Sequence, residues 1–287
     1  MPTTMTPSAA PAAEDAFPPA PRTTFARLAQ AMPFGRSALG VAGVILFLVL
    51  IQVLSLTSGL SAQSFPRATE IVATTLGLFG NGEFLFAVGQ TLYAALVGLV
   101  VATVIAVPLG VLLGTFRVTY DASSALIEFI RPVPSVAMIP LALLLFGATA
   151  EMKIALIIFS VFWIVLFNTI YGVRDVDPLL KDNARIFGYG SLAVLARISL
   201  PSAAPFIYTG IRIATTAAFL VAVGAEMLAG GSGGLGEWLR RYQESGQGSV
   251  YVWAGAFFSG LVGLGINFLL NFGERRLFPW NVSTRSM

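Results

Sequence analysis

The sequence predicts an all-α, polytopic membrane protein with about six transmembrane helices. Of its 287 residues, 56% are hydrophobic and only 11% are charged, whereas soluble domains carry roughly 25% charged residues. The mean hydropathy is +0.82. Six apolar segments are each close to or above the ~20 residues that cross a hydrocarbon core. They lie at 38–56, 85–115, 123–147, 154–172, 203–228 and 250–271.

The first 36 residues differ in composition from the rest of the chain. They hold seven of the sixteen prolines, among Ala, Thr and Ser. Such a segment buries too little apolar surface to order itself, so 1–36 is predicted to be a disordered cytoplasmic tail. Segment 38–56 has an alternative interpretation as a cleaved signal peptide. A leader has a shorter preamble and a shorter apolar core, which favours a first transmembrane helix followed by an outer loop within 37–83.

The basic residues predict the orientation. With a cytoplasmic N-terminus and six single crossings, eleven basic residues fall inside and four outside. The inside set is Arg22, Arg27, Arg36, Arg117, Arg174, Lys181, Arg185, Arg197, Arg275, Arg276 and Arg285, and the outside set is Arg67, Lys153, Arg240 and Arg241. Because cytoplasmic loops are enriched in Lys and Arg, both termini are expected inside, with 274–287 as a cytoplasmic tail.

The third apolar segment contains two charges and three prolines. Glu128 and Arg131 stand at i,i+3 and can neutralise each other, and the alternative is that Arg131 guides an anion. Pro132, Pro134 and Pro140 remove amide donors and should interrupt the helix. Irregular backbone at membrane depth is tolerated where it lines a cavity or is covered by protein, so we expect 131–140 to border a pathway through the membrane.

The fifth apolar segment also carries two charges, Arg212 and Glu226. Fourteen residues apart, they share a helix face but stand about 21 Å apart along the axis, so each needs another partner. This face is expected to meet protein or water, and the alternative is that both side chains snorkel to the membrane surface. The glycine-rich run 230–236 follows, either as a mobile outer loop or as a plain connector. Gly110 and Gly114 form a G-x-x-x-G, a weak signal for helix dimerisation.

Segment 173–202 is the longest loop predicted on the cytoplasmic side. Asp177-Pro178 should start a helix, with Asp as N-cap and Pro at the first helical position. Gly188 suits a left-handed C-cap, and Pro201 is expected to open a further helix that leads into the fifth span. A short amphipathic helix, a glycine turn and a second helix suit docking of a soluble partner. The alternative is a plain interfacial connector.

This loop carries a family resemblance. Permease subunits of bacterial ABC importers have a cytoplasmic signature E-A-A, three residues, G, nine residues, I-x-L-P. The chain resembles it with Asp182-Asn183-Ala184, then Gly188, then Ile198-Ser199-Leu200-Pro201, and both gaps match. Asp replaces Glu and Asn replaces the first Ala. The resemblance covers about 84–273, and the segments Arg131–Leu141, Asn168–Ile170, Thr209–Ala214 and Ala225–Met227 are similar to the branch importing aliphatic sulfonates, taurine, nitrate or bicarbonate.

The resemblance implies the roles of several residues and partners. The loop helix would be a coupling helix seated in an ATPase cleft, with a coupling role for Asp182, Asn183, Ala184, Phe187, Gly188, Ile198, Leu200 and Pro201. The translocation pathway would involve Arg131, Pro132, Pro134, Ser135, Pro140, Arg212 and Glu226. Two cytoplasmic ATPase subunits would bind ATP–Mg, a periplasmic or lipid-anchored binding protein would deliver a small anion, and a second permease copy would complete a homodimer in the bacterial inner membrane.

Composition excludes several other classes of function. The chain has no Cys and no His, so thiolate or imidazole metal sites and Ser–His triads are absent, and no metal site or resident cofactor is expected. Neither lysine ends a Walker A run, so ATP hydrolysis belongs to a partner and the chain is not an enzyme. The net charge of +3 reflects membrane topology, not nucleic-acid binding. A secondary transporter, which needs deep ion-coupling carboxylates, is the alternative.

Overall fold

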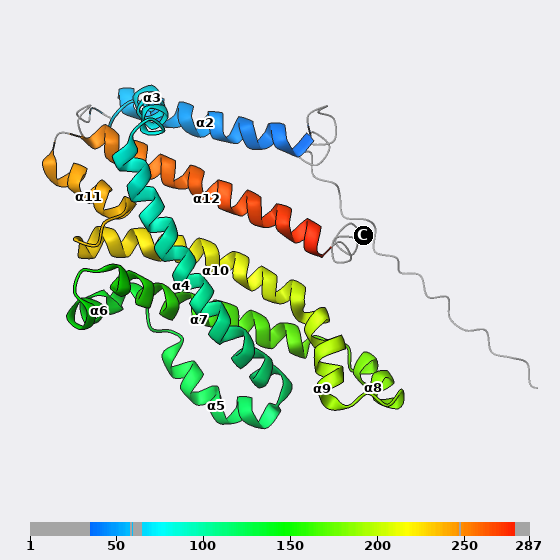
Figure 1. The fold of residues 1–287 in the computed structure, drawn as a ribbon. Helices are drawn as coiled ribbons and strands as arrows, with labels where there is room; N and C mark the ends of the chain where they lie inside the picture. Colours follow the sequence, from blue (N-terminus) through cyan, green and yellow to red (C-terminus); the bar gives the residue numbers. More distant parts are fainter. Residues whose placement is uncertain (1–34, 58, 60–64, 247, 279–287) are drawn as a thin grey trace, which may run out of the picture. The chain divides into compact units, whose positions relative to one another are not determined.

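The computed structural model describes residues 35–57, 59, 65–246 and 248–278. The predicted tail 1–36 therefore lies outside the described residues, apart from Gly35 and Arg36, which begin α2. All regular elements of the described part are helical (Figure 1). They are α2 (Gly35–Thr57), α3 (Ala68–Leu78), α4 (Gly82–Thr115), α5 (Arg117–Ile130), η1 (Ser135–Met138), α6 (Ile139–Phe146), α7 (Ala150–Arg174), α8 (Pro178–Ile186), α9 (Ser191–Val194), η2 (Leu195–Ser199), α10 (Leu200–Ala229), α11 (Leu235–Ser245) and α12 (Ser249–Leu277).

The prediction of an α-helical polytopic membrane protein is confirmed. Among the described residues, five helical stretches are long and apolar enough to cross a membrane. They are Gly40–Thr57, Gly82–Thr115, Ala150–Arg174, Ser191–Ala229 and Ser249–Leu277. The third predicted span, 123–147, is not one helix, because α5 and the η1–α6 segment meet at a bend of 74°. The bend falls at Pro132 and Pro134, whose missing amides break the helical ladder as expected.

The chain divides into two compact units, one ending at Leu54 and the other beginning at Ser55. In the second unit, α4, α7 and α10 pack closely through small residues. A Cβ at Gly98 of α4 would lie 2.5 Å from Ile157 of α7, and one at Gly110 would lie 2.6 Å from Thr169. Gly114 meets α7 in the same way. The G-x-x-x-G of α4 therefore serves packing within the chain, since glycines let two helix backbones approach.

A second, aromatic cluster joins α4, α11 and α12. Phe84 makes edge-to-face contacts with Trp238 and Phe258, at ring-centroid distances of 4.7 and 4.8 Å. Trp238 and Phe84 are fully or almost fully buried. Such pairs stabilise beyond the burial of their area. The cluster holds α11 directly after the glycine-rich run, and thereby fixes where that run lies.

Candidate functional site

The first candidate site is the helix–turn–helix at α8 and α9. Asp177 caps α8, because its side chain accepts a hydrogen bond from the Leu179 amide at 2.8 Å, and Pro178 occupies the first turn. The helix ends in a Schellman motif with Gly188 at φ +85°. The Gly188 amide donates to Arg185 O at 2.9 Å and the Tyr189 amide to Ala184 O at 3.0 Å. The two predicted caps of this helix are thus present.

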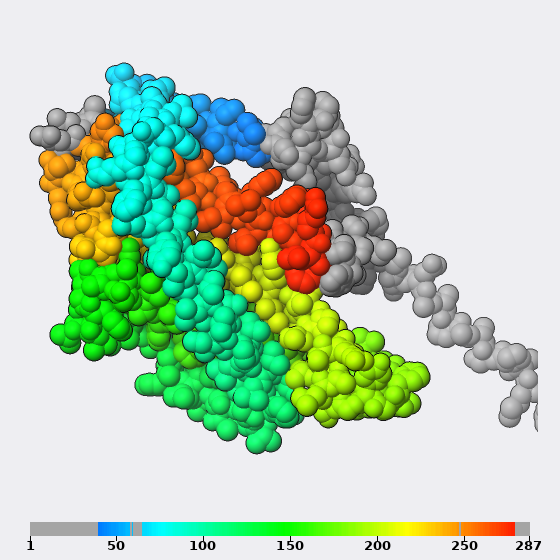
Figure 2. Space-filling model, in the orientation of Figure 1, coloured from blue at the N-terminus to red at the C-terminus, as the bar shows by residue number. Residues whose placement is uncertain are grey.

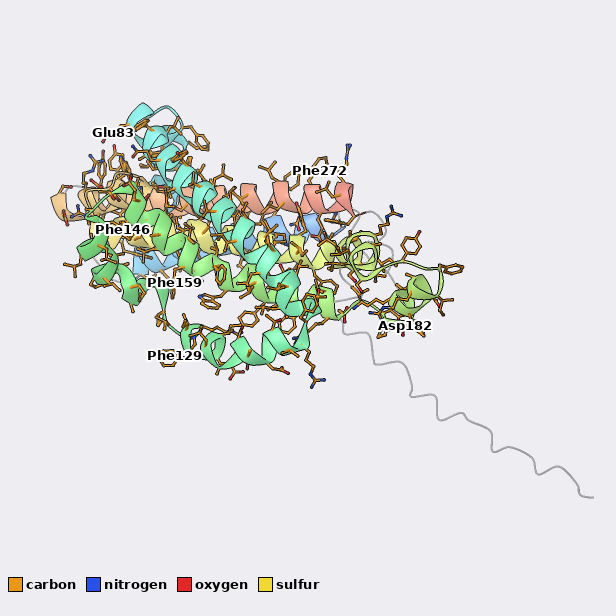
Figure 3. All side chains as sticks on the ribbon, turned by 60° about the horizontal axis from the view of Figure 1, so that its bottom comes forward. Glu83, Phe129, Phe146, Phe159, Asp182 and Phe272 are labelled. Carbon is orange, nitrogen blue, oxygen red and sulfur yellow. The ribbon has the colours of Figure 1, made fainter. Side chains whose placement is uncertain are left out.

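This segment exposes an unusual share of large apolar side chains. Leu179, Ile186, Phe187 and Leu192 are 69–83% exposed. Figure 2 shows α8 and α9 as a yellow-green lobe projecting from the rest of the second unit, and Figure 3 labels Asp182 on this lobe. Asp182 forms an exposed salt bridge with Arg185 at 3.0 Å. No other described part of the chain covers these apolar side chains, so the surface is available to a partner.

The remaining residues of the loop signature differ in their exposure to solvent. Asn183, Gly188, Leu200 and Pro201 are exposed, Ile198 is half-buried, and Ala184 is buried. As expected, Pro201 lies in the first turn of a helix that leads into the membrane, α10, which begins at Leu200. One turn of π-helix, Leu195–Ser199, joins α9 to α10, so the helical stretch from Ser191 to Ala229 is continuous. A wider turn at this point accommodates the missing amide of Pro201.

The second candidate site is a buried salt bridge between α7 and α10. Lys153 Nζ donates to Glu226 Oε1 at 2.8 Å, and the two side chains are 2% and 0% exposed. Thr91 of α4 donates its hydroxyl to Glu226 Oε2 at 2.8 Å, and the Gly236 amide donates to the same oxygen at 2.9 Å. Lys153 was expected in an outer loop, which is wrong: it lies in α7 because that helix begins at Ala150, four residues before the predicted apolar segment.

The glycine-rich run encloses this salt bridge. Lys153 Nζ also donates to the carbonyls of Gly233 and Ser232, at 3.0 and 3.3 Å, so all its N–H groups have acceptors. The Leu235 amide donates to Thr91 Oγ1 at 2.8 Å. A Cβ at Gly234, whose φ is +110°, would overlap the Glu226 carboxylate. The run is therefore neither a plain connector nor a loose loop, because its lack of side chains lets the backbone approach a buried charge pair.

Arg212 has its own partner at the other end of α10. Its Nη1 donates to Glu274 Oε2 of α12 at 2.6 Å and to Asn271 Oδ1 at 2.7 Å. The expectation that Arg212 and Glu226 each need a separate partner is confirmed. Snorkelling alone does not describe them, since each joins α10 to another helix. Between them Phe219, Ala218 and Ala222 are buried, so this part of the face meets protein.

The third candidate site is a cavity of about 480 Å³ between the α5–η1 bend and α7. Arg131 and Ser135 line it, as expected for residues that border irregular backbone, and the guanidinium carbon of Arg131 lies 4.4 Å from the centroid of the Phe167 ring. The predicted salt bridge between Arg131 and Glu128 is absent among the described residues. The two side chains are exposed, and Arg131 lies against α7 instead.

The structure brings together only some of the predicted pathway residues. Arg131 and Ser135 share the cavity, Pro132 and Pro134 form the bend beside it, and Pro140 lies in α6. Arg212 and Glu226 belong to the two separate salt bridges. The sequence did not indicate Thr91, Lys153 or the cavity wall of α7. Lys153 is one of only two lysines, and its place just before an apolar run was the available signal.

Comparisons with known proteins show which families and structures this chain is similar to. The family model for the "Binding-protein-dependent transport system inner membrane component" matches residues 106–279. The nitrate import permease protein NrtB of Leptolyngbya laminosa is 30% identical over 229 residues, covering 80% of this chain and 78% of the relative. A Bacillus subtilis relative, SsuC, is named for aliphatic sulfonate transport and is 30% identical over 253 residues, covering 87% of this chain and 91% of the relative.

A solved structure shares the fold. A chain of the inward-facing MetNI methionine ABC transporter superposes with a TM-score of 0.61 at 20% identity, covering 68% of this chain and 96% of that chain. Together with the loop signature at α8–α9, the family match over more than half of the sequence is decisive. This chain belongs to the binding-protein-dependent inner-membrane components, the permeases of ABC importers.

Proposed function

We propose that this permease carries a small anion across the inner membrane, in a complex with two cytoplasmic ATPase subunits, a second permease copy and a binding protein that delivers the substrate. The α8–α9 surface carries the proposal. It presents exposed apolar side chains on a helix fixed at both ends by caps, which suits a helix-in-groove contact with a soluble subunit. Movement of that subunit would reach the membrane through the unbroken stretch Ser191–Ala229.

Two observations support an anion as the substrate. Relatives at 30% identity are named for nitrate and for aliphatic sulfonates. In addition, Arg131 lines a cavity without a salt-bridge partner among the described residues. In the proposed pathway Arg131, Pro132, Pro134, Ser135 and Pro140 border the route. Arg212 and Glu226 hold its helices together.

The basic residues support a cytoplasmic position for both termini and for α8–α9. Because Lys153 is buried within the helix bundle, it no longer counts as an outer basic residue, and the distribution becomes eleven inside against three outside. This strengthens the bias toward the cytoplasmic side. The same orientation places the glycine-rich run on the outer side, where a binding protein would dock.

The test is reconstitution of the permease with its ATPase and binding protein in proteoliposomes. We expect ATP-dependent uptake of nitrate or an aliphatic sulfonate. Gly188→Val should abolish uptake while insertion and folding remain, because a β-branched residue does not fit φ +85°. Gly190→Val is the matched control, since Gly190 has an ordinary φ of −68° and nothing within 4 Å. Full uptake by Gly188→Val would contradict the coupling role, and uptake without the ATPase would favour a secondary transporter.

A further inference from the structure

We propose that the cavity between the α5–η1 bend and α7 binds an amphiphilic organic monoanion, a carboxylate or sulfonate attached to an apolar body. The inference rests on the proposed transport of an anion and narrows its chemical class. Arg131 would hold the anionic group, and the apolar wall of α7 would hold the body. In Figure 3, α5 with Phe129 lies below the part of α7 that carries Phe159. The lining residues of the cavity come from the bend that follows α5, from η1 and from α7.

The charge of Arg131 is the first argument. If α5 and α6 form one bent crossing, Arg131 lies at its middle, where a charge is costly. Lys153 and Arg212, two basic residues of the helix bundle, are each held by a carboxylate at 2.8 and 2.6 Å. Arg131 has no salt bridge to any described residue, and its guanidinium lies over the face of the Phe167 ring. Such a contact leaves the guanidinium N–H groups free for an anion.

The chemistry of the wall is the second argument. The cavity has a single charged group, Arg131, and no carboxylate among its lining residues. Side-chain hydroxyls come from Ser135, Ser160 and Tyr171, and the amide of Asn168 is partly used, since its Nδ2 donates to Ile164 O at 2.8 Å. The other lining residues are apolar or aromatic, namely Val133, Phe159, Trp163, Ile164 and Phe167.

The composition of this wall distinguishes organic from inorganic anions. An inorganic oxoanion must exchange its hydration shell for hydrogen bonds on every side, whereas the side chains of Val133, Phe159, Ile164 and Phe167 in this wall offer no donor. An organic anion needs donors only at its charged group, and its body gains from the aromatic wall. The volume of about 480 Å³ lies within the roughly 300–1,000 Å³ typical of sites for organic ligands.

The wall is built by one face of α7. Its aromatic row, Phe159, Trp163 and Phe167, repeats every four residues, and a second row contains Ser160, Ile164 and Asn168. The opposite face, with Ile157, Val161 and Val165, is fully buried in the core. Because core packing holds α7, its cavity-facing rows are fixed. The indole Nε1 of Trp163 is buried without a hydrogen-bond partner in the structure.

Binding to the reconstituted transporter complex, in nanodiscs without ATP or binding protein, tests this site. The probes are benzenesulfonate, nitrate and the neutral benzenesulfonamide. We expect benzenesulfonate to bind at least about 10-fold more tightly than either of the other probes. The sulfonamide lacks the charge that strengthens a hydrogen bond to Arg131, and nitrate lacks the apolar body that the wall would bury. Quenching of tryptophan fluorescence should accompany binding and should be lost in Trp163→Phe. Equal affinity for nitrate or for the sulfonamide would overturn the assignment.

Substitutions of Arg131 test whether its guanidinium binds the anionic group of the ligand. Arg131→Met should weaken benzenesulfonate binding at least about 10-fold, and Arg131→Lys should retain part of it. Arg117→Met is the matched control, since Arg117 begins α5, the helix that Arg131 caps, has a 92% exposed side chain and does not line the cavity. It should leave affinity within about twofold. Unchanged binding in Arg131→Met, or the same loss in Arg117→Met, would overturn the proposal.

Two further measurements test whether a lipid occupies the cavity and whether binding and transport fail independently. Phosphatidylglycerol in the nanodisc should not abolish binding. If it does, a lipid headgroup is the occupant of the cavity and the proposal is wrong. ATP-driven uptake is measured in parallel. Wild-type uptake without Arg131-dependent binding would overturn only the cavity assignment, whereas binding without any ATP-driven uptake would overturn only the proposed transport function.

Discussion

Replacing Lys153 with methionine should strongly destabilise the permease. The substitution leaves the Glu226 carboxylate fully buried, with only the Thr91 hydroxyl and the Gly236 amide as donors. It also removes the donor for the carbonyls of Ser232 and Gly233. Removing one partner of a buried salt bridge costs about 3–5 kcal/mol, because the remaining charge is uncompensated.

The double variant Lys153→Met with Glu226→Gln should be more stable than the single variant. It removes both charges, while the glutamine side-chain oxygen still accepts from the Gly236 amide. The two substitutions are therefore non-additive, with a coupling free energy of about 3 kcal/mol in the direction of recovery. Glu244→Gln is a control, since it breaks an exposed salt bridge with Arg240 and should cost less than about 1 kcal/mol.

The assay is thermal unfolding of the purified protein in detergent. For a chain of this size about 1 kcal/mol corresponds to about 2–4 °C, so Lys153→Met should lower Tm by about 6–20 °C. The double variant should regain at least half of this loss. A Lys153→Met variant whose Tm lies within about 2 °C of the wild-type Tm would refute the reasoning, because that difference corresponds to only about 1 kcal/mol. A double variant whose loss of Tm equals the sum of the two single losses would refute it as well.

Three other variants test the same fold and site. Thr91→Val removes both the donor to Glu226 and the acceptor for the Leu235 amide, so thermal unfolding should show a loss of about 1–3 kcal/mol that Thr91→Ser avoids. Gly234→Ala should lower Tm because its Cβ would overlap the Glu226 carboxylate at φ +110°, whereas Gly224→Ala, in an open helical position, should leave Tm unchanged or raise it. Gly188→Val should uncouple binding-protein-stimulated ATP hydrolysis from uptake, and coupled transport in this variant would count against the α8–α9 contact.

The membrane-crossing helices were predictable because they depend on runs of apolar residues. Segment 154–172 lies within α7, which begins four residues earlier, and 250–271 lies within α12, which continues to Leu277. Hydropathy detects the part that contacts lipid, whereas a helix continues until its hydrogen bonds end. The extension matters, since it contains Lys153.

The loop at α8–α9 was predictable for a different reason. Its caps are interactions between residues two to five positions apart, Asp177 with Leu179 and Gly188 or Tyr189 with the last turn. Local hydrogen bonds of this kind leave a local pattern in the sequence. The bend in the third crossing was predictable for the same reason, because a proline removes the amide hydrogen bond of its own residue and so changes the backbone locally.

The charge pairs were decided by the tertiary structure alone. Lys153 and Glu226 are 73 residues apart, and Arg212 and Glu274 are 62 apart. Helix periodicity predicted that Arg212 and Glu226 each need a partner, yet it cannot name one, because neighbours across a bundle follow from helix packing. The same limit applies to the cavity, whose charge comes from the α5–η1 bend and whose wall comes from α7. By itself the sequence determined which segments enter the membrane and where helix α8 begins and ends. Only packing decided which charges neutralise each other, and that Arg131, which forms no salt bridge with the described residues, lines a cavity.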